Sequence, residues 1–343
     1  MKQENDKISD IEPGQKVEID FFKPSDAKGV VNLFKFVYGN AYPISMYLNP
    51  DELIEANRKG SVISSVARTP KGDIVGHNAL FNSAPYKNIY ESGSGLVHPA
   101  YRGGKGIGFA LVAHGQNEVA KRFGIEAIYG EAVCNHVYMQ RLVEKLGWVP
   151  QAIEVDLMPA STYEKEKSAS GRVSSLFYFY CIISKPHKVY LPKRYYRQLS
   201  FLYDILNDDR IIMISDKEIP SHLSTKIEKQ LFDFAQVARL SVIVIGADFG
   251  SVIMEVEREL KEKGIIIIQV WLKLSLAWVG EAVDILRNFG YFLGGILPRW
   301  FDEDGILMQK VLGKPNWEGI NLYTDRSKEI MKFAKEDWMQ NHP

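Results

Sequence analysis

The chain has 343 residues, of which 46% are hydrophobic and 24% charged, and its 42 basic residues balance its 42 acidic residues. This length exceeds what one hydrophobic core usually serves, so two domains are expected, and the composition excludes a wholly disordered chain. A net charge of zero argues against nucleic acid or an anionic membrane surface as a partner.

The distribution of apolar residues and cysteines favours a soluble cytoplasmic protein. Residues 1–15 are polar and lack the apolar core of a secretory signal. The longest apolar run, residues 265–272, is too short for a membrane-spanning helix. Only Cys134 and Cys181 occur, which excludes a disulfide framework and a cysteine-built zinc site and suits a reducing compartment.

The first half of the chain, residues 17–185, predicts alternating strands and helices after a flexible tail over residues 1–16. Period-two alternation predicts the first strand, and an apolar stripe from Val30 to Val37 predicts the first helix. A polar stretch over residues 162–172 predicts a loop. The predicted elements are strand 17–22, helices beginning near 26 and 50, strands 61–68, 74–82 and 90–98, a helix from 108, strand 127–133, helix 137–146, and strands 149–157 and 175–183.

The second half, residues 186–343, partly repeats this order. Its predicted elements are helix 196–206, a strand near Ile211, two strands within 226–245, helix 250–263, strand 265–272, helix 279–288, and strands at Tyr291 and Ile306. Two helices in each half end at a glycine: Gly124 and Gly147, then Gly264 and Gly290. We therefore predict a duplicated fold with domains at 17–185 and 186–343. The alternative is that any helix–strand succession ends its helices this way.

The segment from Leu96 to Leu111 has the sequence features of a ligand-binding site. A strand ends at Pro99, and four glycines then lead directly into a helix. Glycines let several backbone N–H groups converge on one point, and the start of a helix adds positive potential there. Arg102 and Lys105 add cations. This pattern predicts a cradle for a phosphate or a pyrophosphate, formed by Arg102, Gly103, Gly104, Lys105, Gly106, Ile107 and Gly108.

Two common phosphate-binding motifs do not fit this segment. A dinucleotide fingerprint needs a glycine three positions after its second glycine, but Gly108 is followed by Phe109, Ala110 and Leu111. A nucleoside-triphosphate loop needs Gly-Lys before Ser or Thr, but Lys105 precedes Gly106. The preceding strands also form a hairpin rather than a βαβ unit.

Residues 97–103 followed by Gly106, Ile107 and Gly108 resemble the acetyl-CoA pyrophosphate motif of GNAT-type N-acetyltransferases. The element order of residues 17–183 is also similar to that family's order, and residues 143–148 resemble the end of its last helix. Residues 129–136 and 290–300 resemble tandem-GNAT proteins of bacteria, whose second copy is degenerate. The resemblance implies an α/β (α+β) fold with a mixed, mostly antiparallel sheet flanked by helices.

This sequence departs from the family pattern at two places. Gly103 stands where the family has Arg or Gln, with Arg102 one position earlier, so the loop holds one extra residue. Val143 replaces the tyrosine that many members use to protonate the leaving thiolate. That tyrosine's role therefore does not carry over to this chain.

The resemblance implies acetyl-CoA as cosubstrate, no metal, and transfer of the acetyl group to an amine of a small molecule or a protein by direct attack. It places the pantetheine arm between the strands that end at Val97 and Val133. Backbone groups of Leu96 and Val97 are implied to bind the arm and polarise the thioester carbonyl. Asn135, or alternatively His136, is implied to contact the pantetheine amides.

Three residues are candidates for the proton transfers. Glu131, near the end of the strand beside the implied cleft, is the candidate base, and a structural ion pair is the alternative for it. His136 is a second base or a relay. Tyr138 is the nearby phenol for the acid, although an aromatic on a helix more often packs in a core. Cys134 lacks an evident base and is expected to be a small buried residue.

The second half lacks the features of the cradle. Residues 240–249 have no Arg-Gly-x-Gly cluster, and Asp248 places a negative charge where a pyrophosphate would lie. This half is open to three uses: to shape the first domain's cleft, to form a homodimer face, or to bind something else. The main alternative function for the whole chain is a non-catalytic acetyl-CoA-binding module. The sequence carries no motif that identifies the acceptor amine.

Overall fold

The computed structural model describes residues 11–39, 42, 44–104, 106–166, 169–206 and 209–341. Contacts divide the chain after Gly130 into two compact units, which we call unit 1 and unit 2. The boundary lies inside a strand, so it marks contact density rather than a linker. The predicted domains, 17–185 and 186–343, describe a repeat of element order and stay a prediction. None of the helices in the described ranges has the length and apolar composition needed to cross a membrane.

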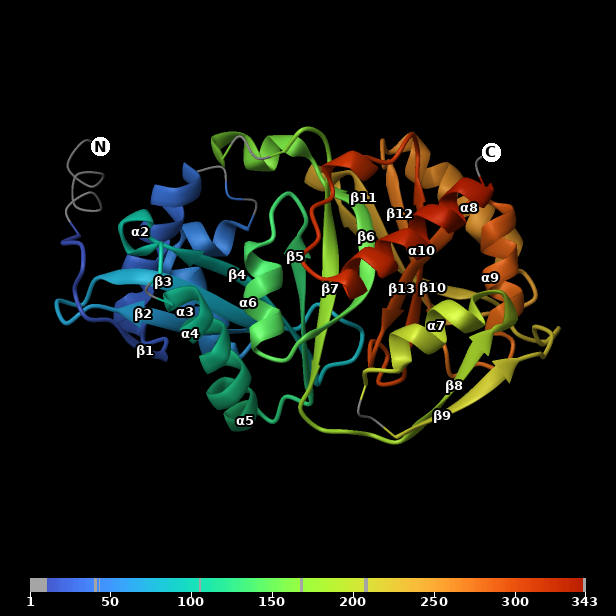
Figure 1. Cartoon of the computed structure of the whole chain (residues 1–343), viewed down its shortest axis with the longest axis horizontal. Helices are drawn as coiled ribbons and strands as arrows, with labels where there is room; N and C mark the ends of the chain where they lie inside the picture. The colour runs from blue at the N-terminus through green and yellow to red at the C-terminus, as the bar shows by residue number, and fades with distance from the viewer. Residues whose placement is uncertain are drawn as a thin grey trace. The chain divides into compact units, whose positions relative to one another are not determined.

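Unit 1 contains a sheet whose first five strands are neighbours in chain order (Figure 1). The first four pair antiparallel, and the fourth pairs with the fifth in parallel. The strands and helices are β1 (Glu18–Phe21), α2 (Ala27–Tyr38), α3 (Pro50–Lys59), β2 (Val62–Arg68), β3 (Ile74–Phe81), β4 (Ile89–Val97), α4 (Ile107–His114), α5 (Ala120–Phe123) and β5 (Ala127–Val133).

Helices cover both faces of the unit 1 sheet. Val66 and Ala67 are successive residues of β2 and therefore face opposite sides. Val66 packs in one core cluster with α2 residues such as Phe34, and Ala67 packs in another with Ile107 and Leu111 of α4. Ile11, within the tail predicted from the sequence, packs against the second cluster. Residues 1–10 of that tail lie outside the described residues.

Unit 2 contains a larger sheet in the strand order β7-β6-β13-β14-β12-β11-β10 and a separate parallel pair, β8-β9. Every described pairing in the larger sheet is antiparallel except that of β11 with β12. Its elements are α6 (Tyr138–Lys145), β6 (Val149–Met158), β7 (Val173–Cys181), β8 (His187–Pro192), α7 (Tyr196–Tyr203), β9 (Arg210–Ser215), β10 (Lys226–Phe232), β11 (Val237–Val244), α8 (Phe249–Glu262), β12 (Ile267–Lys273), α9 (Val279–Asn288), β13 (Phe292–Leu297), β14 (Gly305–Val311) and α10 (Asp325–Asn341).

The predicted fold class is confirmed: a mixed α/β structure with a mostly antiparallel sheet flanked by helices. Two elements were not predicted, β8 and the long helix α10, which packs on β13 and β6 (Figure 1). The buried residues Ile330, Phe333, Ala334 and Asp337 of α10 have helical spacing, so its signal was present in the sequence. The predicted loop at 162–172 begins within a short 3-10 helix, Ala160–Glu166.

Candidate functional site

The turn between β4 and α4 is built on glycines in a left-handed backbone conformation. Gly103, Gly104 and Gly106 have φ angles of 81°, 101° and 66°, which residues with a side chain rarely adopt. A Cβ atom placed on any of the three would meet nothing within 4 Å. Among the described residues, the turn is therefore open around these three glycines.

The backbone amides of this turn are available to a ligand. Within the described part of unit 1, no hydrogen-bond acceptor faces the amides of Gly103, Gly104, Gly106, Ile107 or Gly108. Gly106 is the N-cap of α4, so the last amides belong to the first helical turn, where the helix dipole adds positive potential. These are the features that the predicted anion cradle requires. Lys105, predicted to add a cation, lies outside the described residues.

Arg102 is directed towards the end of β4. Its Nε donates to the carbonyl oxygen of Val97 at 2.9 Å. Val97 is partly buried and Leu96 is 7% exposed, and both belong to the strand that leads into the cradle. The structure thus joins Val97 and Arg102, two of the predicted binding residues, at one place, with the Arg102 guanidinium against the strand end.

β4 contains a bulge before it reaches the cradle. Leu96 pairs with His77 and Gly93 pairs with Ala79, so Ser94 and Gly95 together oppose Asn78. Ser94 has a φ angle of 50°, which is uncommon for a residue with a side chain. The described register between β4 and β5 ends at the pair Glu91 and Tyr129. The rest of β4 therefore extends beyond its described pairing with β5.

Glu91 is a candidate catalytic residue that the sequence analysis missed. It lies on β4 at the last residue paired with β5, and it belongs to the same unit as the cradle. Its Oε2 accepts a 2.5 Å hydrogen bond from the hydroxyl of Ser83, and that hydroxyl also contacts the hydroxyl of Tyr129. A signal was present in the sequence, because Glu91 is the one carboxylate inside the predicted strand 90–98.

Aromatic residues from the α2 side of the sheet lie near Glu91. Burial and, to a smaller extent, the negative charge of Glu91 raise the pKa of Tyr42. Tyr47 stacks on Phe34 with 4.4 Å between ring centroids, and its hydroxyl is buried. Glu91 is therefore a partly buried carboxylate close enough to Tyr42 for its charge to affect that phenol.

Glu131, the predicted base, lies in unit 2 and forms an ion pair. Its Oε1 accepts from the guanidinium of Arg239 at 2.9 Å. The same guanidinium contacts Glu154, which is fully buried, and Gln269. This is the structural ion pair that the sequence analysis kept as the alternative for Glu131. It does not remove Glu131 as a candidate, but it gives the side chain a structural role.

The other predicted residues of unit 2 lie in the turn between β5 and α6 or, for Tyr138, at the first position of α6. The rings of His136 and Tyr138 have centroids 4.9 Å apart. The Nδ1 atom of His136 is buried and meets no hydrogen-bonding group among the described residues. Tyr138 is 73% exposed, so its phenol is not packed in the core. Cys134 is fully buried, and burial raises the pKa of its thiol well above its ordinary value, as expected for an unreactive residue.

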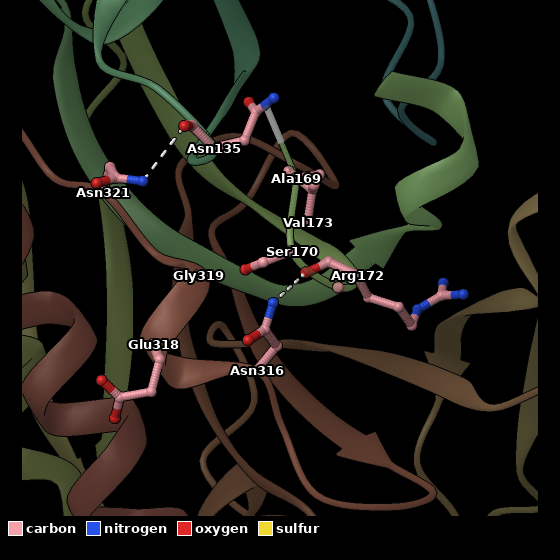
Figure 2. A pocket seen from close by; sticks show the side chains of 10 residues that line it. Asn135, Ala169, Ser170, Arg172, Val173, Asn316, Glu318, Gly319 and Asn321 are labelled. Atoms are coloured by element: carbon pink, nitrogen blue, oxygen red, sulfur yellow. Dashed lines mark hydrogen bonds between the residues drawn. The ribbon is translucent and has the colours of Figure 1, made fainter. Parts of the chain in front are cut away.

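A segment near the C-terminus holds this turn in place. The amide of Asn321 donates to the carbonyl of Cys134 at 2.7 Å, and the Asn321 side chain donates to the carbonyl of Asn135 at 3.2 Å (Figure 2). Gln140 of α6 returns two hydrogen bonds, one to the carbonyl of Asn321 and one from the amide of Tyr323. Asn135, predicted to bind pantetheine, is therefore positioned by residues far along the chain.

Asn135 also lines a cavity of about 230 Å³ within unit 2 (Figure 2). Asn316, Ser170 and Glu318 contribute to its polar wall. The Asn316 side chain is occupied, since its Nδ2 donates to the carbonyl of Arg172 at 3.0 Å. Figure 2 shows the Arg172 side chain directed away from the other lining residues, and its guanidinium donates to three backbone carbonyls. The cavity therefore lacks a free cation among its described lining residues.

Comparison with known families supports the family named by the resemblance. The model of the acetyltransferase (GNAT) family matches residues 27–148. A search of curated proteins finds no match to this chain.

Solved structures that resemble the chain align with about half of it. A putative acetyltransferase from Acinetobacter baylyi is 16% identical with a TM-score of 0.41, covering 50% of this chain and 95% of its own. The ribosomal-protein-S5-alanine acetyltransferase from Vibrio fischeri is 14% identical, with a TM-score of 0.40 and the same coverage. A putative acetyltransferase from Salmonella typhimurium, solved with its cofactor acetyl-CoA, is 18% identical with a TM-score of 0.39, covering 50% and 96%. Residues 27–148 are therefore the part of this chain that is similar to the acetyltransferase (GNAT) family.

Proposed function

We propose that the first half of the chain transfers an acetyl group from acetyl-CoA to an amine, by direct attack of that amine in a ternary complex. The observation that carries this proposal is the open turn at Gly103–Gly108, whose amides have no acceptor among the described residues. A diphosphate supplies the oxygen atoms that such a turn lacks. When bound, acetyl-CoA supplies an acyl group activated as a thioester.

The residues of the cradle have distinct roles in this proposal. The amides of Gly103, Gly104, Gly106, Ile107 and Gly108 hold the diphosphate, with Arg102 and Lys105 as the nearby cations. The part of β4 beyond its described pairing with β5, including Leu96 and Val97, binds the pantetheine arm through its backbone and polarises the thioester carbonyl. Asn135 binds the pantetheine amides, in the position that Asn321 helps to maintain.

Glu91 is our first candidate for the base that takes the proton of the attacking amine. It lies where β4 separates from β5, and Ser83 holds one of its carboxylate oxygens. Glu131 and His136 remain candidates for a base or a relay, and Tyr138 for the acid that protonates the leaving thiolate.

We further propose that residues 186–343 are a degenerate copy of the first half. In the first half, β3 pairs antiparallel with β4, β4 pairs in parallel with β5 across a helix, and β6 pairs antiparallel with β7. In the second half, β10, β11 and β12 repeat the first two relations across α8, and β13 and β14 repeat the third. A shared ancestor explains this repeat of order and direction.

A non-catalytic acetyl-CoA-binding module is the second candidate function. Val143, which stands where many family members have the acid tyrosine, is buried on α6, so no phenol occupies that position. The ion pair of Glu131 points in the same direction. A module of this kind would keep the cradle but would not need a residue that acts as a catalytic base.

Release of CoA from acetyl-CoA, measured against a panel of small amines and peptides, tests both candidates. We expect amine-dependent turnover that falls by about 100-fold or more in Glu91→Gln, because general-base catalysis contributes about that much. Acetyl-CoA affinity, measured by calorimetry, should be unchanged in that variant. Glu18→Gln, an exposed carboxylate on β1 of the same sheet, is the matched control.

Each other outcome has a definite meaning. If Glu131→Gln loses activity and Glu91→Gln does not, the base is Glu131 and our assignment of Glu91 is wrong. Tight acetyl-CoA binding without turnover over the whole panel would support the binding module. Absence of acetyl-CoA binding would overturn both candidates.

A further inference from the structure

Two strands of unit 2 expose apolar side chains along edges that no described strand covers. β9 pairs only with β8, and β10 pairs only with β11, so each ends its sheet. Four successive residues of β9 and the last two of β10 are each 36–55% exposed: Ile211, Ile212, Met213, Ile214, Leu231 and Phe232. Long, apolar, unpaired strand edges are templates for pairing with another chain.

The strands of unit 1 at the same place in the order of elements pair with each other. β2 and β3 precede β4 in the chain, as β9 and β10 precede β11. β2 and β3 pair antiparallel over their whole length, and the short turn Thr69–Asp73 closes the hairpin. By its place in the order of elements, β9 is therefore the strand expected beside β10.

The linker between β9 and β10 explains why the two strands of one chain do not pair. It spans residues 216–225, twice the length of the turn in unit 1. Near its start, the amide of Lys217 donates to the carbonyl of Ala277, and the amide of Ile219 donates to Glu281 at 2.6 Å. Near its end, the carbonyl of Leu223 accepts from the amide of Ala247. Because both ends are fastened to other elements, the linker holds the hairpin open.

We propose that β9 of one copy of this chain pairs antiparallel with β10 of a second copy, and that β10 of the first copy pairs with β9 of the second. A two-fold axis relates the two ladders, so the assembly closes as a dimer. Each copy thereby supplies the strand that the other copy's open hairpin lacks. This proposal concerns assembly and does not depend on the acetyltransferase activity.

One antiparallel register brings apolar residues of the two strands together. It places Ile211 opposite Phe232 and Ile212 opposite Leu231, which are favourable cross-strand pairs. Beyond them, Met213 lies opposite Gln230 and Ile214 opposite Lys229. At the far end of the ladder, Asp216, whose side chain is 52% exposed, lies within one position of Lys226, which is also exposed, so opposite charges meet there.

Two strand edges of each copy take part in this interface. Each copy contributes the six exposed apolar side chains and the backbone edges of β9 and β10 that no described strand covers. A partner of different sequence would have to match both edges at once, whereas a second copy matches them by symmetry.

The mass of the full chain in solution, measured by light scattering after gel filtration, is the first test. We expect a dimer for the natural sequence and a monomer for Ile212→Lys, because a buried unpaired charge is costly in the ladder. Met254→Lys is the matched control, since Met254 is 55% exposed and belongs to α8 rather than to either strand. A natural chain that stays monomeric at concentrations of tens of micromolar would overturn the proposal. So would an Ile212→Lys chain that stays dimeric.

Cysteine cross-linking is the second test, and it identifies which strands meet. In a Cys181→Ser background, with Cys134 buried, the double variant Ile212→Cys, Leu231→Cys should oxidise to a covalent dimer. Neither single variant should do so. A covalent dimer of the Ile212→Cys single variant would mean that β9 pairs with β9, which contradicts the proposal. Oxidation within one chain of the double variant would mean that the hairpin closes on itself, which also contradicts it.

Discussion

The two halves of this protein each contain a turn that leads from a strand into a helix, and the two turns differ in what their amides contact. In the turn from β4 to α4, the amides of Gly103–Gly108 have no acceptor among the described residues. In the turn from β11 to α8, the amide of Ala247 donates to the carbonyl of Leu223, and the amide of Gly246 donates to the hydroxyl of Thr225. The first turn is open to an anion, and the second is filled by the chain itself.

The backbone of a neighbouring segment lies directly against the second turn and occupies the space that an anion would need. A Cβ atom on Gly246 would lie 2.4 Å from the carbonyl oxygen of Leu223, so the backbone of residues 223–225 lies directly against the turn. Asp248 adds a carboxylate, which accepts from the amide of Thr225 at 2.7 Å. A strand, a glycine and a helix start are therefore not sufficient for an anion site. The amides must also lack internal acceptors.

The largest expected effect is the loss of acetyl-CoA binding in Gly106→Asp. Gly106 has a left-handed backbone, and an aspartate there would place a negative charge in the cradle. We expect affinity to fall at least 100-fold by calorimetry, and the natural chain to bind a single acetyl-CoA because the second turn is filled. Gly124→Asp is the control: Gly124 has a φ angle of 64° and open space around it, but lies outside the cradle. Unchanged affinity in Gly106→Asp would show that the diphosphate binds elsewhere.

An intermediate effect is expected on stability for Gly246→Ala. The added methyl group would force residues 223–225 away from the second turn, at a cost of about 1–3 kcal/mol in the free energy of unfolding. Urea denaturation measures this cost, and acetyl-CoA affinity should not change. At Gly250 of α8, the nearest atom to an added Cβ is 3.5 Å away, so Gly250→Ala should be neutral or stabilising. If Gly246→Ala were equally harmless, the second turn would not be tightly filled.

The smallest effect is expected on the pH dependence of stability in Asp248→Asn. Hydrogen bonds from Thr225 lower the pKa of the Asp248 carboxyl below its ordinary value of 3.8. A lowered pKa in the folded state stabilises the fold above the unfolded pKa, and this contribution is lost as the pH falls below about 4. The melting temperature of the natural chain should therefore slightly exceed that of Asp248→Asn at pH 7, and the two should converge at pH 3. If the difference in melting temperature were the same at both pH values, it would arise from packing rather than from the charge of Asp248.

Much of the fold could be predicted because its signals are local. The strand predicted at residues 127–133 is β5 with the same bounds, and the helix predicted at 279–288 is α9. Period-two and helical patterns, together with glycines at helix ends, depend on neighbours in the chain. β8 was missed because Lys185 and Pro186 indicated an exit from a domain, and a proline next to a short strand weakens its pattern.

The candidate site was predictable only where its function resides in the backbone. The glycine turn can be recognised in the sequence, because left-handed φ angles and close approach of a ligand to the backbone both require glycine. The contacts between distant side chains cannot be recognised in the sequence. Glu131 meets Arg239, which lies 108 positions along the chain, and Asn135 is held by Asn321, which is 186 positions away.

The sequence alone therefore determined the order of elements and the position of the glycine turn, since both depend on residues that are adjacent along the chain. Only the tertiary structure decided which amides remain without acceptors, which carboxylate is held by an arginine, and which strand edges stay uncovered. Those properties depend on the register of strands and on long-range contacts, which many different distant residues could have satisfied.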